Sequence, residues 1–159
     1  MSADTLTQCL ARRYALALGL LTVLFAFRVI AQLVQFWYPV DFLPAFNRWH
    51  SEVLPYHWLV VTQVMILWMC LGVIWRLMNN RVIPSSRKGH LLSVLGLIYF
   101  GGMCIRLLVG ATVAKEHDWF GAALPTVFHL VLASFVILFG RFHTLGTQAL
   151  PVTQKGELI

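Results

Sequence analysis

Four polar side chains lie inside long apolar stretches of this 159-residue chain, and their chemistry suits ligand binding or proton transfer. They are Arg28, Gln63, Arg106 and His129. A guanidinium group recognises paired oxygen atoms, an amide donates and accepts hydrogen bonds, and an imidazole exchanges protons near neutral pH. Because such residues are costly in lipid, they usually face the interior of a helical bundle or a water-filled cavity. They are therefore the first candidates for a functional site.

The elements that must position these side chains are four apolar segments, each long enough to cross a bilayer. The chain is 59% hydrophobic and 11% charged, which excludes a water-soluble globular domain and a disordered chain. The apolar runs are continuous rather than alternating, so they predict helices and not the strands of a barrel. We expect an all-α fold, a single antiparallel four-helix transmembrane bundle with helices at 14–37, 55–78, 91–114 and 122–143, and a short tail at 144–159.

The distribution of basic residues predicts the orientation of the bundle. The chain has 12 Lys and Arg against 6 Asp and Glu, a formal charge of +6. The first and third connections carry only Arg48 and Lys115. Most of the other basic residues lie in three places: before the first segment (Arg12, Arg13), between the second and third (Arg76, Arg81, Arg87, Lys88), and at or after the end of the fourth (Arg141, Lys155). The positive-inside rule then places both termini and the middle connection in the cytoplasm. We expect a multi-pass protein of a bacterial inner (plasma) membrane, with the lipid bilayer as its partner and no nucleic acid.

In this orientation each helix carries one polar residue at a similar depth. At the rise of an α-helix, Arg28, Gln63, Arg106 and His129 all fall about 10–13 Å below the outer surface. Each also belongs to a wider face, such as the one that adds Gln32 one turn after Arg28. We therefore expect the four faces to converge on a polar pocket in the outer leaflet.

The two arginines of this pocket have no acidic neighbour within the apolar segments. Every Asp and Glu of the chain lies in a connection or a terminal segment, although an Arg near mid-membrane costs roughly 2.5–3.5 kcal/mol. The side chains could extend to water and lipid phosphate, or pair with acids of the outer connections, or bind an anionic or carbonyl-bearing ligand. Those acids are Asp41, Glu52, Glu116 and Asp118. All three solutions remain open at this stage.

The connection between the first two segments is rich in aromatic residues and proline. Such a composition suits the headgroup level, so we expect residues 36–58 to lie on the outer surface, with a short interfacial helix at 43–51. This connection could form an ordinary aromatic belt. In the alternative, Trp49, His50 and Tyr56 close the mouth of the pocket.

Six histidines also raise the question of a b-type haem, which needs two ligands at equal depth on facing helices. His90 and His143 both fall at the inner boundary and form the best-matched pair. The three cysteines contain no CxxC pair, so no metal site is predicted. The cofactor candidates are thus a quinone or a b-type haem.

Three functions fit this pattern. In the leading hypothesis the protein is a binding or accessory protein, for example a subunit of a membrane redox complex. Its pocket would hold a small oxygen-rich ligand such as a quinone, a lipid headgroup or a haem propionate. Arg28 and Arg106 would supply charge, Gln32 and Gln63 hydrogen bonds, and His129 a proton.

Two alternatives assign the same residues other roles. In a membrane enzyme, His129 would act as a general acid or base on a lipophilic substrate while the arginines stabilise an oxyanion. In a structural or assembly subunit, the polar residues would only set the helix register, and the partners would be other membrane subunits or further copies of the chain. No hydrolase or nucleotide-binding motif indicates an enzyme class.

Overall fold

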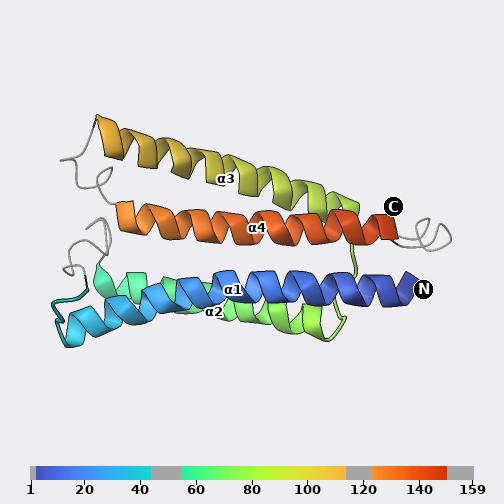
Figure 1. Ribbon diagram of the computed structural model, residues 1–159, viewed down its shortest axis with the longest axis horizontal. Helices are drawn as coiled ribbons and strands as arrows, with labels where there is room; N and C mark the ends of the chain where they lie inside the picture. Colours follow the sequence, from blue (N-terminus) through green and yellow to red (C-terminus); the bar gives the residue numbers. More distant parts are fainter. Residues whose placement is uncertain (1–2, 44–54, 114–122, 150–159) are drawn as a thin grey trace.

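The computed structural model contains four helices, α1 (Ala3–Trp37), α2 (Tyr56–Met78), α3 (Ser86–Thr112) and α4 (Ala123–Ala149). The structure describes residues 3–43, 55–113 and 123–149. Consecutive helices run in opposite directions, so the start of α1, the end of α4 and the α2–α3 connection lie at one end (Figure 1). We call this the terminal end. The four helices are each long and apolar enough to cross a membrane, which confirms the predicted all-α helical bundle.

Three helices extend beyond the segments predicted from apolarity. α1 begins at residue 3 rather than 14, α3 begins at 86 rather than 91, and α4 ends at 149 rather than 143. Apolarity marks the part of a helix that lipid can surround and does not mark where its hydrogen bonding stops. In the extra turns of α4, the Thr147 hydroxyl donates to the carbonyl of His143 at 2.7 Å. Residues 144–149, predicted as tail, therefore belong to α4.

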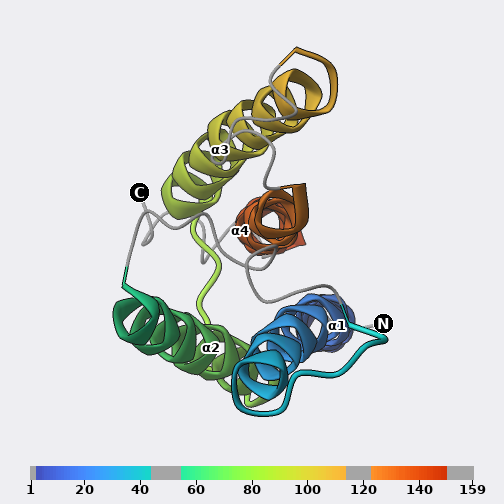
Figure 2. The ribbon, with the colours of Figure 1, turned by 90° about the vertical axis from the view of Figure 1, so that its left-hand side faces the viewer.

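The helices form an open arc in the order α2, α1, α4, α3 (Figure 2). α3 packs along α4, α4 packs against α1, and α1 packs against α2. Within the described ranges, α2 makes no comparable contact with α3 or α4. The antiparallel arrangement agrees with the prediction. However, the helix faces that carry the four polar residues do not meet around one common axis. Among the described residues, α2 therefore packs mainly against α1.

Glycines bring α3 and α4 into close contact. A Cβ atom added at Gly89 would lie 2.9 Å from the carbonyl oxygen of Gly140, and one added at Gly140 would lie 2.8 Å from the backbone nitrogen of Ser93. Small residues allow this approach, which is how membrane helices commonly associate. The contact fixes the register of α3 on α4, and with it the position of every polar side chain on α3.

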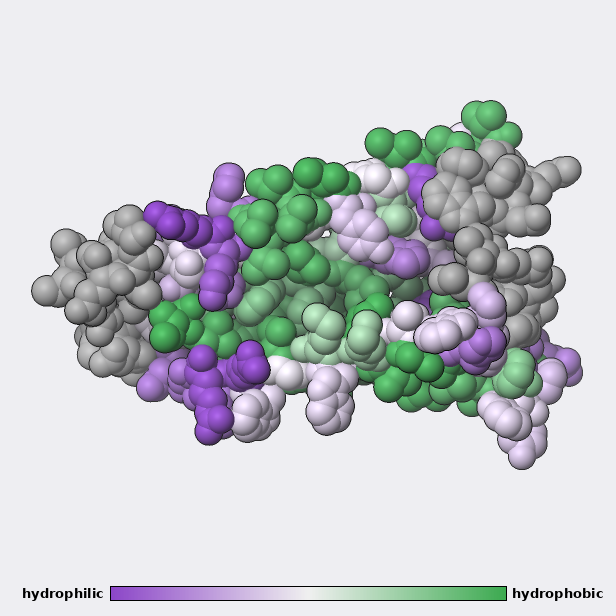
Figure 3. All heavy atoms as spheres, turned by 180° about the vertical axis from the view of Figure 1, so that it is seen from behind, coloured by the Kyte–Doolittle hydropathy of each residue, from purple (hydrophilic) through white to green (hydrophobic). Residues whose placement is uncertain are grey.

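Large apolar side chains are divided between a small core and the outer surface. Leu18, Leu77 and Phe142 are almost fully buried in one cluster, to which α1, α2 and α4 all contribute. Many others point outward, such as Trp68, which is 79% exposed. On the face in Figure 3, hydrophobic residues cover the middle and hydrophilic ones gather mainly toward the ends. An apolar band between polar ends is what a lipid-facing surface requires.

Candidate functional site

All four helices contribute to a group of polar side chains in the half of the molecule away from the terminal end. We call this group the polar layer, and it consists of Arg28, Gln32, Gln63, Tyr99, Arg106 and His129. The exposed fractions of Arg28, Gln32, Gln63 and Arg106 are only 6%, 1%, 4% and 7%. His129 is half-buried. At the rise of an α-helix, the four predicted residues lie about 9–14 Å from the nearer end of their helices.

On α3 and α4, the polar layer centres on the imidazole of His129. Its Nδ1 lies 2.6 Å from the Tyr99 hydroxyl in a hydrogen bond, and the two rings meet edge to face. Tyr99 also interacts electrostatically with Arg106, which follows two turns later on the same face of α3. Since this bond uses Nδ1 and no other described residue bonds the ring, Nε2 is the nitrogen available for a ligand.

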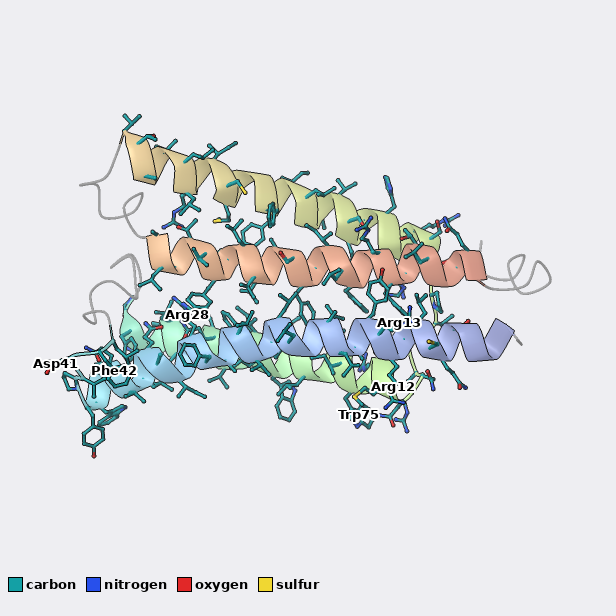
Figure 4. All side chains as sticks on the ribbon, in the orientation of Figure 1. Arg12, Arg13, Arg28, Asp41, Phe42 and Trp75 are labelled. Atoms are coloured by element: carbon teal, nitrogen blue, oxygen red, sulfur yellow. The ribbon has the colours of Figure 1, made fainter. Side chains whose placement is uncertain are left out.

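Arg28 approaches α4 from the side of α1. Its guanidinium group lies over the ring of Phe128, 5.4 Å from the centroid, and Figure 4 shows its side chain extending from α1 toward α4. Arg28 and Arg106 are both close enough to act electrostatically on His129. Two cations from the helices that flank α4 thus act on one imidazole.

α2 joins the polar layer through a single amide pair. Gln63 donates a hydrogen bond from Nε2 to the Oε1 atom of Gln32, at 3.1 Å. The Nε2 atom of Gln32 is buried and has no hydrogen-bond partner among the described residues. Gln32 lies one turn after Arg28 on α1. The N–H group of Gln32 that has no partner therefore lies on the same face of α1 as the buried cation of Arg28.

The predicted mouth of the pocket is only partly described. Tyr56 is half-buried and stacks on Phe36, with ring centroids 4.4 Å apart, where α1 ends and α2 begins. Trp49 and His50 lie outside the described residues, as does nearly all of the predicted interfacial helix at 43–51. Of the four loop acids, Asp41 is exposed, and Glu52, Glu116 and Asp118 also fall outside. The role of this connection stays a prediction.

The two histidines considered for haem differ in their surroundings. His90 is exposed on α3, whereas His143 is 4% exposed on α4. His143 accepts a hydrogen bond at Nδ1 from the backbone N–H of Ser85, 3.1 Å away. This bond ties the α2–α3 connection to α4. The sequence pattern did not indicate this hydrogen bond, because Ser85 and His143 lie far apart along the chain.

Two members of the site were not among the predicted site residues. Tyr99 precedes Arg106 by two helical turns, so the helical period alone places them on one face. Phe128 could not be found in this way, because adjacent residues of a helix point in directions about 100° apart. Its contact with Arg28 depends on how α1 packs against α4, which the sequence pattern does not specify.

The fold and the polar layer define a class of protein, an all-α bundle with four potential membrane-spanning helices and two buried arginines. No protein-family model matches the chain, and no curated protein and no solved structure matches it.

Proposed function

We propose that this chain is an integral membrane protein whose polar layer binds the oxygen atoms of a small ligand. The ligand carries carbonyl, carboxylate or phosphate oxygens, as a quinone, a lipid headgroup or a haem propionate does. The observation that carries the proposal is that two buried arginines, Arg28 on α1 and Arg106 on α3, lie on the helices that flank α4 and act electrostatically on His129. Guanidinium groups are well suited to recognising oxygen atoms in pairs.

The hydrogen-bonding inventory of the polar layer supports an acceptor ligand. Both arginines are donors only, and Gln32 adds a buried N–H that no described residue accepts. The four spanning segments contain no Asp or Glu. A site with this excess of donors and positive charge favours a ligand with negative or strongly polarised oxygen atoms.

The Tyr99–His129 pair favours a quinone among these ligands. The hydrogen bond to Tyr99 holds the imidazole in place, so that Nε2 can donate to a carbonyl oxygen while an arginine stabilises the charge on it. In this proposal the terminal end faces the cytoplasm of a bacterial inner membrane and the polar layer lies in the outer leaflet. A redox partner subunit would then exchange electrons with the bound quinone.

The experiment is native mass spectrometry of the full-length protein in mild detergent, with solvent extraction to identify small molecules by mass and absorbance. We expect a quinone to accompany the wild-type protein and to fall at least about tenfold in the Arg28→Leu/Arg106→Leu variant. Arg141→Leu, which removes an exposed arginine from α4, is the matched control and should retain it. Thermal unfolding of each variant shows whether it is folded.

Other outcomes of this experiment would change the identity of the ligand or overturn the proposal. A Soret band would identify haem, and a co-purified lipid would identify a headgroup, so either would replace the quinone within the same site. If the double arginine variant is folded and retains the ligand, the polar layer does not bind it. If only stoichiometric protein subunits accompany the wild-type chain, a structural role replaces the binding role.

The 2.6 Å contact between Tyr99 and His129 also favours the enzymatic alternative, in which His129 is a general acid or base. His129→Gln separates the two functions, because glutamine retains hydrogen bonding but cannot exchange a proton in this way. A binding protein should keep most of its ligand in this variant. An enzyme should bind its substrate and lose turnover by about a hundredfold or more.

A further inference from the structure

The terminal end of the bundle carries a second basic site, separate from the polar layer. A pocket of about 540 Å³ lies between the end of α2, the α2–α3 connection, the start of α3, and α4. Arg76, Arg81 and Lys88 line it together with His143, and the remaining walls are apolar. No acidic side chain is among the described residues that line the pocket. Its volume is in the usual range for a ligand site.

A specific turn at the end of α2 positions two of these cations. The N–H of Arg81 donates to the carbonyl of Arg76 at 2.9 Å, and the N–H of Asn80 donates to that of Leu77 at 3.1 Å. This is a Schellman motif, and Asn80 has the left-handed conformation it requires, with φ of 52°. The turn brings the Arg81 guanidinium group over the ring of Trp75, 4.8 Å from its centroid. The backbone of Arg81 is therefore held beside that of Arg76, and its side chain is held by Trp75.

The other side of the pocket is attached to α4. The Ser85 N–H donates to Nδ1 of His143, so a neutral His143 carries its own proton on Nε2 and adds a donor to the lining. Pro84 packs against Gly146, where an added Cβ would lie 2.7 Å from the proline Cγ. Lys88, in the first turn of α3, is near enough to His143 to interact with it electrostatically. The backbone that carries the donors is thus fixed on both sides.

We propose that this pocket binds the phosphate group of an anionic phospholipid. Three cations in the end turns of α2 and α3 and in their connection lie where lipid headgroups are expected, and basic pockets between membrane helices bind such headgroups. The apolar walls, such as Val73 and Leu92, suit the glycerol and upper acyl chains of a lipid. A soluble phosphate ion would bind to the same cations, but it has no apolar groups to bury against those walls.

The open arc of helices supplies a path for the acyl chains. α2 and α3 do not pack along each other in the described residues, and both border the pocket. Ile83 and Leu91 line the pocket and are 68% and 60% exposed. A bound lipid would therefore extend from the cations along apolar surface that no described helix covers.

The test is a lipid titration of the full-length protein in detergent, followed by native mass spectrometry. The probes are phosphatidylglycerol and phosphatidylcholine with identical acyl chains. We expect phosphatidylglycerol to bind at least about tenfold more tightly than phosphatidylcholine. The Arg76→Gln/Arg81→Gln/Lys88→Gln variant should lose this preference.

The matched control is Arg12→Gln/Arg87→Gln/Arg141→Gln, which removes the same number of charges from residues that do not line the pocket. Arg12 lies at the terminal end (Figure 4), and Arg87 and Arg141 lie near the start of α3 and the end of α4. This variant should keep the preference within about twofold. An equal loss in both variants would show that overall charge is responsible, and would overturn the proposal.

A second pair of variants leaves all the cations in place. Ile83→Glu puts a negative charge at an exposed position of the wall and should weaken phosphatidylglycerol binding about tenfold, while Ile83→Gln should not. Inorganic phosphate distinguishes the two sources of the anion. If millimolar phosphate binds to the wild-type protein and to Ile83→Gln while phosphatidylglycerol shows no preference, the pocket takes a soluble anion and the lipid proposal is wrong.

Discussion

The polar layer and the pocket at the terminal end both contain two arginines and a histidine, but the arginines differ in burial. Arg28 and Arg106 are 6% and 7% exposed, whereas Arg76, Arg81 and Lys88 are exposed. An exposed cation is screened by water and salt and costs little to place. A buried guanidinium group loses its hydration, so it has to be stabilised by the groups around it. The basic residues of the pocket can therefore orient the chain and still bind a lipid, while those of the polar layer need a further explanation.

The two regions are also built differently. Each buried cation of the polar layer acts on a residue of another helix, such as Phe128 or His129 on α4. In the pocket, Arg81 is held by a turn and a ring from its own segment of chain. The polar layer thus depends on helix packing throughout, whereas the pocket combines a local turn that positions Arg81 with the attachment of the α2–α3 connection to α4. Substitutions that change helix packing and substitutions in the turn should therefore affect the two regions differently.

The largest effect is expected where α3 packs on α4, because α3 contributes Arg106 to the polar layer and Lys88 to the pocket. Gly140→Ala would place a Cβ 2.8 Å from the backbone nitrogen of Ser93, and backbone atoms cannot yield at low cost. We expect the free energy of unfolding to fall by about 1–3 kcal/mol. Titration of dodecylmaltoside micelles with SDS, followed by tryptophan fluorescence, measures it.

Gly102→Ala is the control, since nothing lies within 4 Å of a Cβ at that position. It should be neutral or stabilise the helix by about 0.5–1 kcal/mol. Lipid binding at the pocket should weaken in Gly140→Ala by at least as much as ligand binding at the polar layer, because Phe139 and Leu92, the sequence neighbours of Gly140 and Ser93, line the pocket. Equal stability of the two alanine variants would show that the close contact between α3 and α4 is not required.

The sequence indicates the depth of the polar residues because the rise of a helix converts position into depth. Arg28, Gln63 and Arg106 are indeed buried inside apolar helices. The sequence pattern did not indicate which helices pack together. That choice depends on close contacts such as Gly89 against Gly140, which are decided by three-dimensional fit and not by period. For this reason the opening between α2 and α3 was not expected.

The pocket was not predicted because its residues already had an explanation. Arg76, Arg81 and Lys88 served as markers of orientation, and exposed charges at helix ends usually need no other role. The local signal was Asn79-Asn80 at the end of an apolar segment, since asparagine can take the left-handed conformation that ends a helix. The role of His143 in the pocket could not be predicted from local sequence, because its hydrogen bond to Ser85 joins distant segments of the chain.

A second prediction compares the two cation–π contacts. Arg28 and Phe128 meet in a buried setting, while Arg81 and Trp75 meet at the surface, where Trp75 is 55% exposed. Desolvation strengthens such contacts, so Phe128→Leu should lower the free energy of unfolding by about 2 kcal/mol and Trp75→Leu by about 0.5–1 kcal/mol. The same SDS titration measures both.

Phe100→Leu is the control for lost aromatic volume, because Phe100 is half-buried and stacks on no cation in the described part of the chain. The difference between Phe128→Leu and this control isolates the interaction with Arg28. If Trp75→Leu costs as much as Phe128→Leu, burial does not distinguish the two regions in the way we infer.

The smallest effect is expected at the amide pair that joins α2 to the polar layer. Hydrogen bonds between membrane helices contribute about 0.6 kcal/mol on average, so Gln63→Leu should destabilise the protein by about 1 kcal/mol, including the amide left unsatisfied on Gln32. The double variant Gln32→Leu/Gln63→Leu leaves no unpaired amide and should be close to wild type in stability. A double-mutant cycle measures the interaction.

A comparison of the single variants Gln32→Leu and Gln63→Leu tests whether Gln32 contributes to ligand binding. Of the two amide groups, that of Gln32 has a buried N–H group without a hydrogen-bond partner in the described residues, whereas Gln63 uses its Nε2 in the bond between them. If a ligand oxygen accepts from Gln32, then Gln32→Leu should weaken ligand binding about tenfold while Gln63→Leu changes it little. Equal losses in the two variants would mean that the pair acts only through helix packing, and the polar layer would then bind its ligand through the arginines and His129 alone.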